Sequence, residues 1–275
     1  MNSKVLLDSN SKSVRKFSGE SFESKYFSLK SPIKETENED GLGIFELENG
    51  RVVFVVTDGL GGHKAGQRAS EISLLTFEEL LSSHEKQRRQ SQGLSQIIVE
   101  CFEEANRRVI REIPGSGTTL VVGLLEENAL KSFHAGDSEL LVFNSELEVK
   151  FRTQNHSPVA ALIQSGEITE EDALFHEERH LVVNVIGDPE LEPEIGPSVK
   201  LDDGDYLLLA SDGLFDNYSL GQLLSVWQGD DLESLGQSLK NCLLQKYKLF
   251  EDEDEESDEW AKADDMTFLL SRFSI

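Results

Sequence analysis

Short apolar runs that end at Gly, Asp or Asn recur through this 275-residue chain. Val, Leu and Phe dominate these runs, whose short length is typical of buried β-strands. The strands that they predict are Arg51–Thr57, Thr118–Leu125, Ala129–His134, Glu139–Phe143 and Tyr206–Ala210, with a last one beginning at Met266. A chain with this many short strands must fold around one or more β-sheets.

Helical periodicity separates these strands into groups. Between the first two strands, one segment repeats small and apolar residues from Ala65 to Leu80, and a second does so from Leu94 to Arg111. Two more helices are expected at Leu220–Trp227 and Leu232–Leu249. Because strands and helices come in blocks rather than alternating one by one, the pattern favours an α+β sandwich. We expect residues 1–24 to be a flexible extension or an irregular first strand, and residues 25–275 to form one domain.

The charge of the chain excludes several kinds of partner. There are 52 Asp and Glu residues against 26 Lys and Arg residues, so the formal net charge is -26. Such a chain is repelled by nucleic acids and by anionic membranes, and we expect it to bind neither. Cys101 and Cys242 stand apart without a metal-binding spacing, and the first residues contain no signal-peptide core, so we expect a cytoplasmic protein without disulfides.

Carboxylates stand next to several of the predicted strands. Asp58-Gly59 and Asp212-Gly213 each follow an apolar run directly, and Asp264-Asp265 precedes the last strand. Glu39-Asp40 and Asp137 also lie beside strand-like or turn-like segments. One Asp-Gly alone is more often a simple turn. Several carboxylates fixed at strand ends, however, predict an oxygen-lined site for Mg²⁺ or Mn²⁺.

Such a site would permit hydrolysis without a side-chain nucleophile. Two ions about 4 Å apart can activate a shared water and bind a phosphate. The chain has no GxSxG elbow, no CxxxxxR thiolate loop and no GxxxxGK[ST] nucleotide loop. The sequence therefore favours hydrolysis of a phosphate ester by a water molecule that two metal ions activate.

At these residues the chain resembles the metal-dependent serine/threonine phosphatases of the type 2C-like (PPM) family, in its bacterial form. Order and spacing of the motifs agree from about residue 30 to about residue 273. The segments that carry the resemblance are Asn38-Glu39-Asp40, Thr57–His63, Ala65-Gly66, Gly117–Thr119, Ala135–Ser138, Asn155–Ser157, Gly204-Asp205, Ser211–Leu214, Asp216, Asp264 and Thr267.

The resemblance implies a four-layer α-β-β-α sandwich of two antiparallel sheets flanked by helices, with the metal ions at one edge. It implies that Asp58 bridges two ions, that the carbonyl of Gly59 binds one of them, and that Asp212 and Asp264 complete a shell. Asp40 would act near the second ion. The resemblance also implies a third metal position at Asp137 and a flap over about residues 157–189. The general acid would be either His63 or a metal-bound water. A structural role for His63 at the start of a helix is equally open.

The chain also departs from the family pattern. The arginine that usually contacts phosphate is replaced by Glu35, with Lys34 beside it as the candidate phosphate-binding residue. The usual Asp-Asn pair is Asp264-Asp265, of which we favour Asp264 as the ligand. The usual Arg after Asp-Ser is Glu139, a change expected to be tolerated on the surface. The acidic run 251–259 is interpreted as a solvated loop.

Three functions fit these observations. The first is hydrolysis of phosphoserine and phosphothreonine in proteins, with a serine/threonine kinase or its substrates as partners. The second is a catalytically weak, phosphatase-like module that binds phosphoproteins. The third is the same chemistry on a regulator of transcription or secretion. The retained Asp58, Asp212 and Asp264 favour the first.

Overall fold

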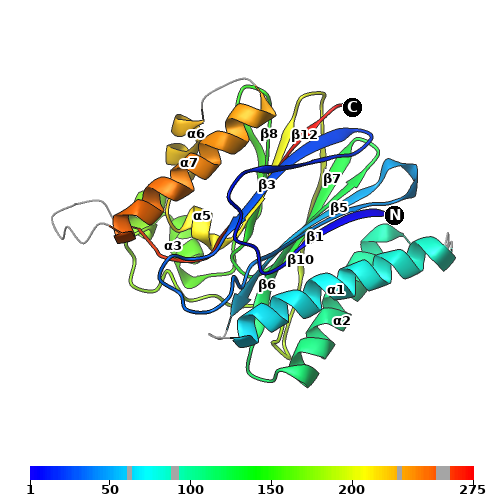
Figure 1. The fold of residues 1–275 in the computed structure, drawn as a ribbon, viewed down its shortest axis with the longest axis horizontal. Coiled ribbons are helices and arrows are strands. Elements are labelled where there is room, and N and C mark those ends of the chain that lie inside the picture. Colours follow the sequence, from blue (N-terminus) through cyan, green and yellow to red (C-terminus); the bar gives the residue numbers. More distant parts are fainter. Residues whose placement is uncertain (61–63, 88–92, 228–230, 252–260) are drawn as a thin grey trace.

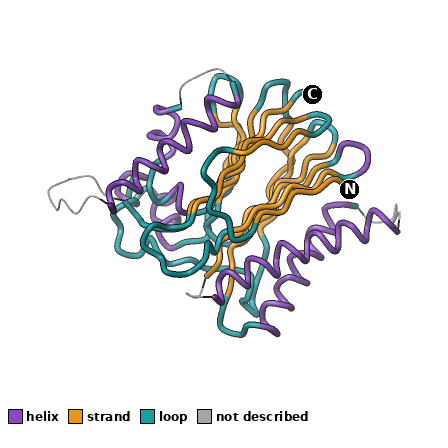
Figure 2. Tube along the Cα trace, in the orientation of Figure 1, coloured by secondary structure: helices purple, strands orange, loops and turns teal. Residues whose placement is uncertain are grey.

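The computed structural model describes residues 1–60, 64–87, 93–227, 231–251 and 261–275. Within these ranges the strands form two antiparallel sheets of six strands each, packed face to face. Helices cover the outer face of each sheet (Figure 1), so the molecule has four layers in the order α-β-β-α (Figure 2). The fold class predicted from the sequence is confirmed.

The first sheet has the order β1-β4-β5-β6-β7-β10. Its strands are β1 (Asn2–Leu6), β4 (Gly41–Glu46), β5 (Val52–Leu60), β6 (Gly117–Glu126), β7 (Ala129–Ala135) and β10 (Glu194–Lys200). The long helices α1 (Lys64–Gln87) and α2 (Leu94–Glu112) pack on its outer face. Phe77 of α1 and Phe102 of α2 meet edge to face there, with ring centroids 5.9 Å apart. Their apolar stripes are the periodic segments seen in the sequence.

The second sheet has the order β2-β3-β12-β11-β8-β9. Its strands are β2 (Arg15–Ser18), β3 (Phe22–Leu29), β12 (Met266–Phe273), β11 (Tyr206–Ala210), β8 (Glu139–Phe143) and β9 (Val149–Arg152). Helices α5 (Asp212–Phe215), α6 (Leu220–Val226) and α7 (Leu232–Glu251) cover it. Between β9 and β10 lie the short helices α3 (Pro158–Ser165) and α4 (Glu170–Ala173), and a 3-10 turn, η1 (Glu48–Gly50), joins β4 to β5.

The space between the sheets is filled by apolar side chains from both of them. Phe54 of β5 packs edge to face on Phe22 of β3, with centroids 5.2 Å apart. The middle strands β5 and β11 contact each other across this interior. Because each of these strands leads into an Asp-Gly pair, the packing of the sheets brings the two aspartates to the same edge.

The predicted strands and helices agree with the structure, and the N-terminal segment follows one of the two alternatives expected for it. Residues 2–6 form β1, which pairs with β4 from Asn2↔Glu46 to Leu6↔Leu42, and residues 15–18 form β2. Of the two alternatives expected for this segment, a flexible extension or an irregular first strand, these residues therefore form strands. Both are edge strands that are only partly buried, and neither contains an apolar run as long as those of the central strands.

The described helices include none that is both long enough and apolar enough to cross a membrane. Cys101 and Cys242 are both buried and unpaired.

Candidate metal centre

Four aspartates gather at one edge of the sandwich because their strands are neighbours. Asp40 lies just before β4 and Asp58 lies near the end of β5, and these strands pair with Gly41 opposite Thr57. Asp212 opens α5 directly after β11, and Asp264 lies two residues before β12, which pairs with β11. Strand pairing and sheet packing together therefore supply the convergence that the sequence predicted.

The two Asp-Gly pairs do not form simple turns. β5 continues through Gly59 to Leu60, and Gly213 lies within the first turn of α5. Each glycine is instead required by a close backbone contact. A Cβ on Gly59 would lie 2.4 Å from the carbonyl group of Gly66, and one on Gly213 would lie 2.1 Å from the carbonyl oxygen of Asp265.

The carboxylates of the centre are buried and crowd one another. Asp40 is 2% exposed and Asp58 is 6% exposed. Burial raises the pKa of Asp58 well above its ordinary value, and the negative charges of Asp212, Asp40 and Asp264 raise it further. Burial and the charge of Asp265 likewise raise the pKa of Asp40. Holding these groups ionised next to one another requires positive charge among them.

Unpartnered oxygen atoms indicate where such charge fits. Within the described residues, Oδ1 of Asp40, Oδ1 of Asp212 and Oε1 of Glu39 are buried and accept no hydrogen bond. Buried acceptors of this kind are normally satisfied. The donor set consists of carboxylate oxygens, which are the ligands that Mg²⁺ and Mn²⁺ prefer. The residues present therefore fit divalent ions.

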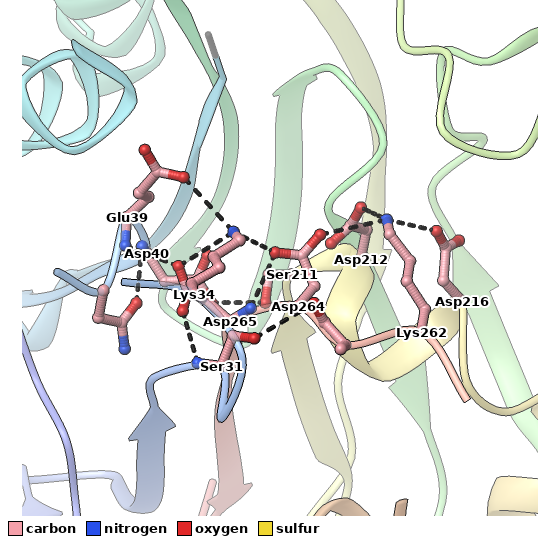
Figure 3. Close-up of polar contacts among 12 residues, drawn as sticks. Ser31, Lys34, Glu39, Asp40, Ser211, Asp212, Asp216, Lys262, Asp264 and Asp265 are labelled. Atoms are coloured by element: carbon pink, nitrogen blue, oxygen red, sulfur yellow. Dashed lines mark hydrogen bonds and ion pairs between the residues drawn. The ribbon is translucent and has the colours of Figure 1, made fainter. Parts of the chain in front are cut away.

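Asp264 and Asp265 have different surroundings. Asp265 is buried, and its carboxylate accepts the backbone N–H groups of Ser31 at 2.7 Å and of Glu39 at 2.9 Å. It thus holds together two loops that border the centre. Asp264 is more exposed and faces the other carboxylates (Figure 3). This difference supports Asp264 as the candidate ligand and gives Asp265 a positioning role.

Two lysines lie among the carboxylates (Figure 3). Nζ of Lys34 donates to Asp264, and lies 3.3 Å from Oδ2 of Asp265 and 3.4 Å from Oε2 of Glu39. Its ammonium therefore lies in the centre, where the sequence predicted a phosphate-binding residue. Lys262 was missed by the sequence analysis, and its position two residues before Asp264 is the signal that would have pointed to it.

The Lys262 ammonium extends between three carboxylates. It donates to Asp212 and to Oδ2 of Asp216, the latter at 2.7 Å, and lies 3.5 Å from Oδ2 of Asp264. Burial is the largest single influence and raises the pKa of Asp212, but the lowering influences, led by the charge and the hydrogen bond of Lys262, together exceed it, so the pKa is lowered overall. For Asp216 burial is the stronger effect and raises the pKa to about 7.

Asp137 approaches the centre from a turn after β7. Gly136 has a φ of 98°, and a Cβ there would lie 2.7 Å from the side chain of Thr119, so this position does require glycine. The imidazole of His156 accepts the N–H of Gly136 at 3.2 Å and fixes the turn. Burial raises the pKa of Asp137, and the nearby charges of Asp212 and Asp216 add to it. The turn therefore holds Asp137 beside Asp212.

The expectation for Glu139 is wrong. Glu139 is only 2% exposed, and its carboxylate accepts hydrogen bonds from Arg152 and from Asn155. Arg152 also donates to Glu170 of α4 at 2.6 Å. The other oxygen of Glu170 accepts the N–H of Leu220, at the start of α6. The predicted flap segment is thus fastened to the domain through Glu170.

A second group of candidate ligands lies outside this centre. The rings of His134 and His156 stack with centroids 4.5 Å apart, and Nε2 of His156 lies 3.3 Å from Oε2 of Glu194. The sequence showed no ligand spacing among the histidines, because β7, β10 and the segment after β9 bring them together from distant positions. His63 and residues 252–259 of the acidic run lie outside the described residues.

Comparison with known proteins agrees with this geometry. The sequence profile of the family described as "Protein phosphatase 2C" matches residues 33–246. A "Putative protein phosphatase 2C-type" from Streptococcus pyogenes is 33% identical over 212 residues, which cover 72% of this chain and 82% of the relative.

Solved structures have the same architecture. The serine/threonine phosphatase Stp1 from Staphylococcus aureus superposes with a TM-score of 0.70 at 28% identity, covering 92% of this chain and 94% of its own. The catalytic domain of the serine threonine protein phosphatase PstP, crystallised with two manganese ions, superposes with a TM-score of 0.69. It is 23% identical and the match covers 93% of this chain and 99% of that one, so this likeness speaks to the fold alone.

Proposed function

The chain belongs to the protein phosphatase 2C family and is a metal-dependent protein serine/threonine phosphatase, and we propose that the described acidic centre is its catalytic site. The observation that carries the proposal is the set of buried, unpartnered carboxylate oxygens at one edge of the sandwich. Strands from both sheets deliver these oxygens, so the site is held by the rigid part of the fold.

The residues proposed to hold two Mn²⁺ or Mg²⁺ ions are Asp58, the carbonyl of Gly59, Asp212, Asp264 and Asp40. When bound, the ions lower the pKa of water enough for it to attack phosphorus at neutral pH. The hydroxyl of Ser211 donates to Oδ2 of Asp40 at 2.8 Å, which orients the other oxygen of that carboxylate.

Other residues of the chain are proposed to serve the phosphate ester itself. Lys34 reaches the centre where the family arginine is absent, and supplies a point charge rather than a bidentate fork. We propose His63, which precedes α1, as the acid that protonates the leaving serine or threonine oxygen. The flap helix α4 lies next to Arg152 and α6, where it would border the path of a phosphoprotein substrate.

The partners are phosphorylated proteins. We propose further that they include a serine/threonine kinase or its substrates, and that the protein works in the cytoplasm. Two unpaired, buried cysteines fit such a reducing compartment, and the net charge of -26 fits a partner that is neither nucleic acid nor an anionic membrane.

Hydrolysis of a phosphothreonine peptide by the EDTA-treated protein, with and without added Mn²⁺, tests this function. We expect turnover only with the metal, and its loss in Asp212→Asn. Asp202→Asn is the matched control, because Asp202 is an exposed aspartate paired with Lys150 away from the centre. Metal-independent turnover, or full activity of Asp212→Asn, would contradict the proposal.

The absent phosphate arginine favours a second candidate, a phosphoprotein-binding module with weak catalysis. Binding of the phosphopeptide by calorimetry at saturating Mn²⁺, without release of inorganic phosphate, would support that alternative.

A further inference from the structure

Lys262 brings a positive charge into the centre (Figure 3), and the proposed reaction gives this charge no role. Its ammonium contacts Asp212 and Asp216 directly and lies 3.5 Å from Oδ2 of Asp264. The side chain is only 17% exposed. A fixed positive charge among three carboxylates has the surroundings that a bound metal cation would have.

The backbone of Lys262 is held in place by a buried amide. Its N–H donates to Oδ1 of Asn217 at 2.7 Å, and Nδ2 of Asn217 donates to the carbonyl oxygens of Lys262 at 3.0 Å and of Gly213 at 2.9 Å. Asn217 is 1% exposed. Because Gly213 follows Asp212, one side chain fixes the lysine relative to the aspartate that it contacts. The lysine is therefore part of the built site, not a loose surface chain.

The contacts of Lys262 lie on the side of the centre that Asp137 approaches. Asp137 and Asp216 line the same cavity, and Lys262 donates to Asp216. The negative charges of Asp212 and Asp216 act on Asp137, and the charge of Lys262 opposes them. A third divalent ion between Asp137 and Asp212 would have to displace this ammonium or bind next to it against its repulsion.

We propose that Lys262 is a built-in cation that takes the place of a third divalent ion beside Asp137, so that the chain binds two ions rather than three. This inference rests on the proposed function, since it takes the other two ions to be bound by Asp58 and its neighbours. The ammonium neutralises Asp212 and Asp216 whatever the metal concentration, which leaves Asp137 without an ion of its own.

The test is the number of Mn²⁺ ions bound by the full chain, measured by calorimetric titration and by metal analysis after EDTA treatment. We expect two ions for the wild type and a third for Lys262→Met, which keeps an unbranched side chain one atom shorter and removes its charge. The third ion should disappear in the double variant Lys262→Met with Asp137→Asn. Lys262→Arg should bind two.

Lys150→Met is the matched control, because Lys150 also bridges two aspartates, Asp202 and Asp205, but at the opposite end of β11 from Asp212. It should bind two ions. If Lys262→Met does not fold, as judged by circular dichroism, Asp137→Asn alone decides: the proposal requires that it bind the same two ions with unchanged affinity.

Three ions in the wild type, or two in folded Lys262→Met, would overturn the proposal. If Lys262→Met binds two ions and has a raised KM for the phosphopeptide, the proposal is also overturned, and Lys262 is a phosphate-binding residue. A wild type that binds no Mn²⁺ overturns this inference and the proposed function together. Two bound ions without turnover overturn only the proposed function.

Discussion

The metal centre and the Glu139–Arg152–Glu170 cluster are two groups of buried charge that differ in how their oxygens are used. Asp137 and Glu139 are two residues apart, and burial raises the pKa of both. Both oxygens of Glu139 accept hydrogen bonds from Arg152. In the metal centre, Oδ1 of Asp212 and Oδ1 of Asp40 accept no hydrogen bond from any described residue.

This difference teaches that burial of a carboxylate is not by itself a sign of function. The cluster around Arg152 is complete without any bound group, so it serves the fold. In the metal centre, Oδ1 of Asp40 and Oδ1 of Asp212 accept no hydrogen bond within the described ranges and like charges lie close together, so this arrangement favours a bound cation. Mutations should therefore separate the two regions: one set should cost activity and the other stability.

The largest expected effect is the loss of catalytic activity in the variant Asp58→Asn. Loss of a carboxylate proposed to bridge two ions should remove on the order of 4 kcal/mol of transition-state stabilisation, so kcat should fall about 1000-fold. The metal-free variant should unfold at the same or a higher urea concentration, because one of the crowded charges is gone. Phosphopeptide turnover with Mn²⁺ and urea unfolding with EDTA measure the two effects. If Asp58→Asn lost enough stability to explain its lost activity, the metal centre would not differ from the Arg152 cluster in the way expected.

The next largest expected effect is the loss of stability in the variant Arg152→Met. This substitution leaves Glu139 buried without its counter-charge and should lower the free energy of unfolding in urea by about 3 kcal/mol. The double variant that adds Glu139→Met should recover most of this loss, because no buried charge remains. Residual Mn²⁺ binding by the folded fraction should be unchanged. If Arg152→Met unfolds like the wild type, the cluster is not the structural element described above.

The pH dependence of the metal-free protein sharpens the comparison further. The pKa of Asp216 rises from an ordinary 3.8 to about 7, so between these values the folded chain holds a proton that the unfolded chain has lost. Stability must then fall as the pH rises through this window, by on the order of 2 kcal/mol from pH 5 to pH 7. The raised pKa values of Asp40, Asp58 and Asp137 act in the same direction.

Urea unfolding at pH 5 and pH 7 in EDTA measures this fall, and Asp216→Asn should reduce it. Saturating Mn²⁺ should oppose it, because the ligands bind metal in their deprotonated form. Greater stability of the metal-free wild type at pH 7 than at pH 5 would contradict the expected sign.

The two regions also differ in what could be predicted from the sequence. The central strands and the carboxylates beside them were predictable because an apolar run next to Asp is a local pattern. The charge environment of Glu139 was not predictable, because its partner Arg152 lies on β9, a partly exposed strand without an apolar run. Lys262 was missed for a related reason: its contacts with Asp212 and Asp216 depend on the packing of α5 against the segment before β12.

The smallest expected effect is at the exposed end of the Arg152 cluster, where Glu170 joins α4 to the domain. Glu170→Gln keeps an acceptor for the N–H of Leu220 but removes the charge that faces Arg152. Since both side chains are partly exposed, the change should cost about 1 kcal/mol and speed hydrogen exchange over residues 166–176 about fivefold, with little change in global unfolding.

Glu167→Gln is the matched control, because Glu167 lies in the same segment and its side chain accepts a hydrogen bond from the nearby Ser165. It should leave exchange unchanged. If Glu170→Gln lowered global stability as much as Arg152→Met, the flap would unfold together with the core. The contrast between a rigid centre and a separately fastened flap would then have no basis, because the same charges would hold both.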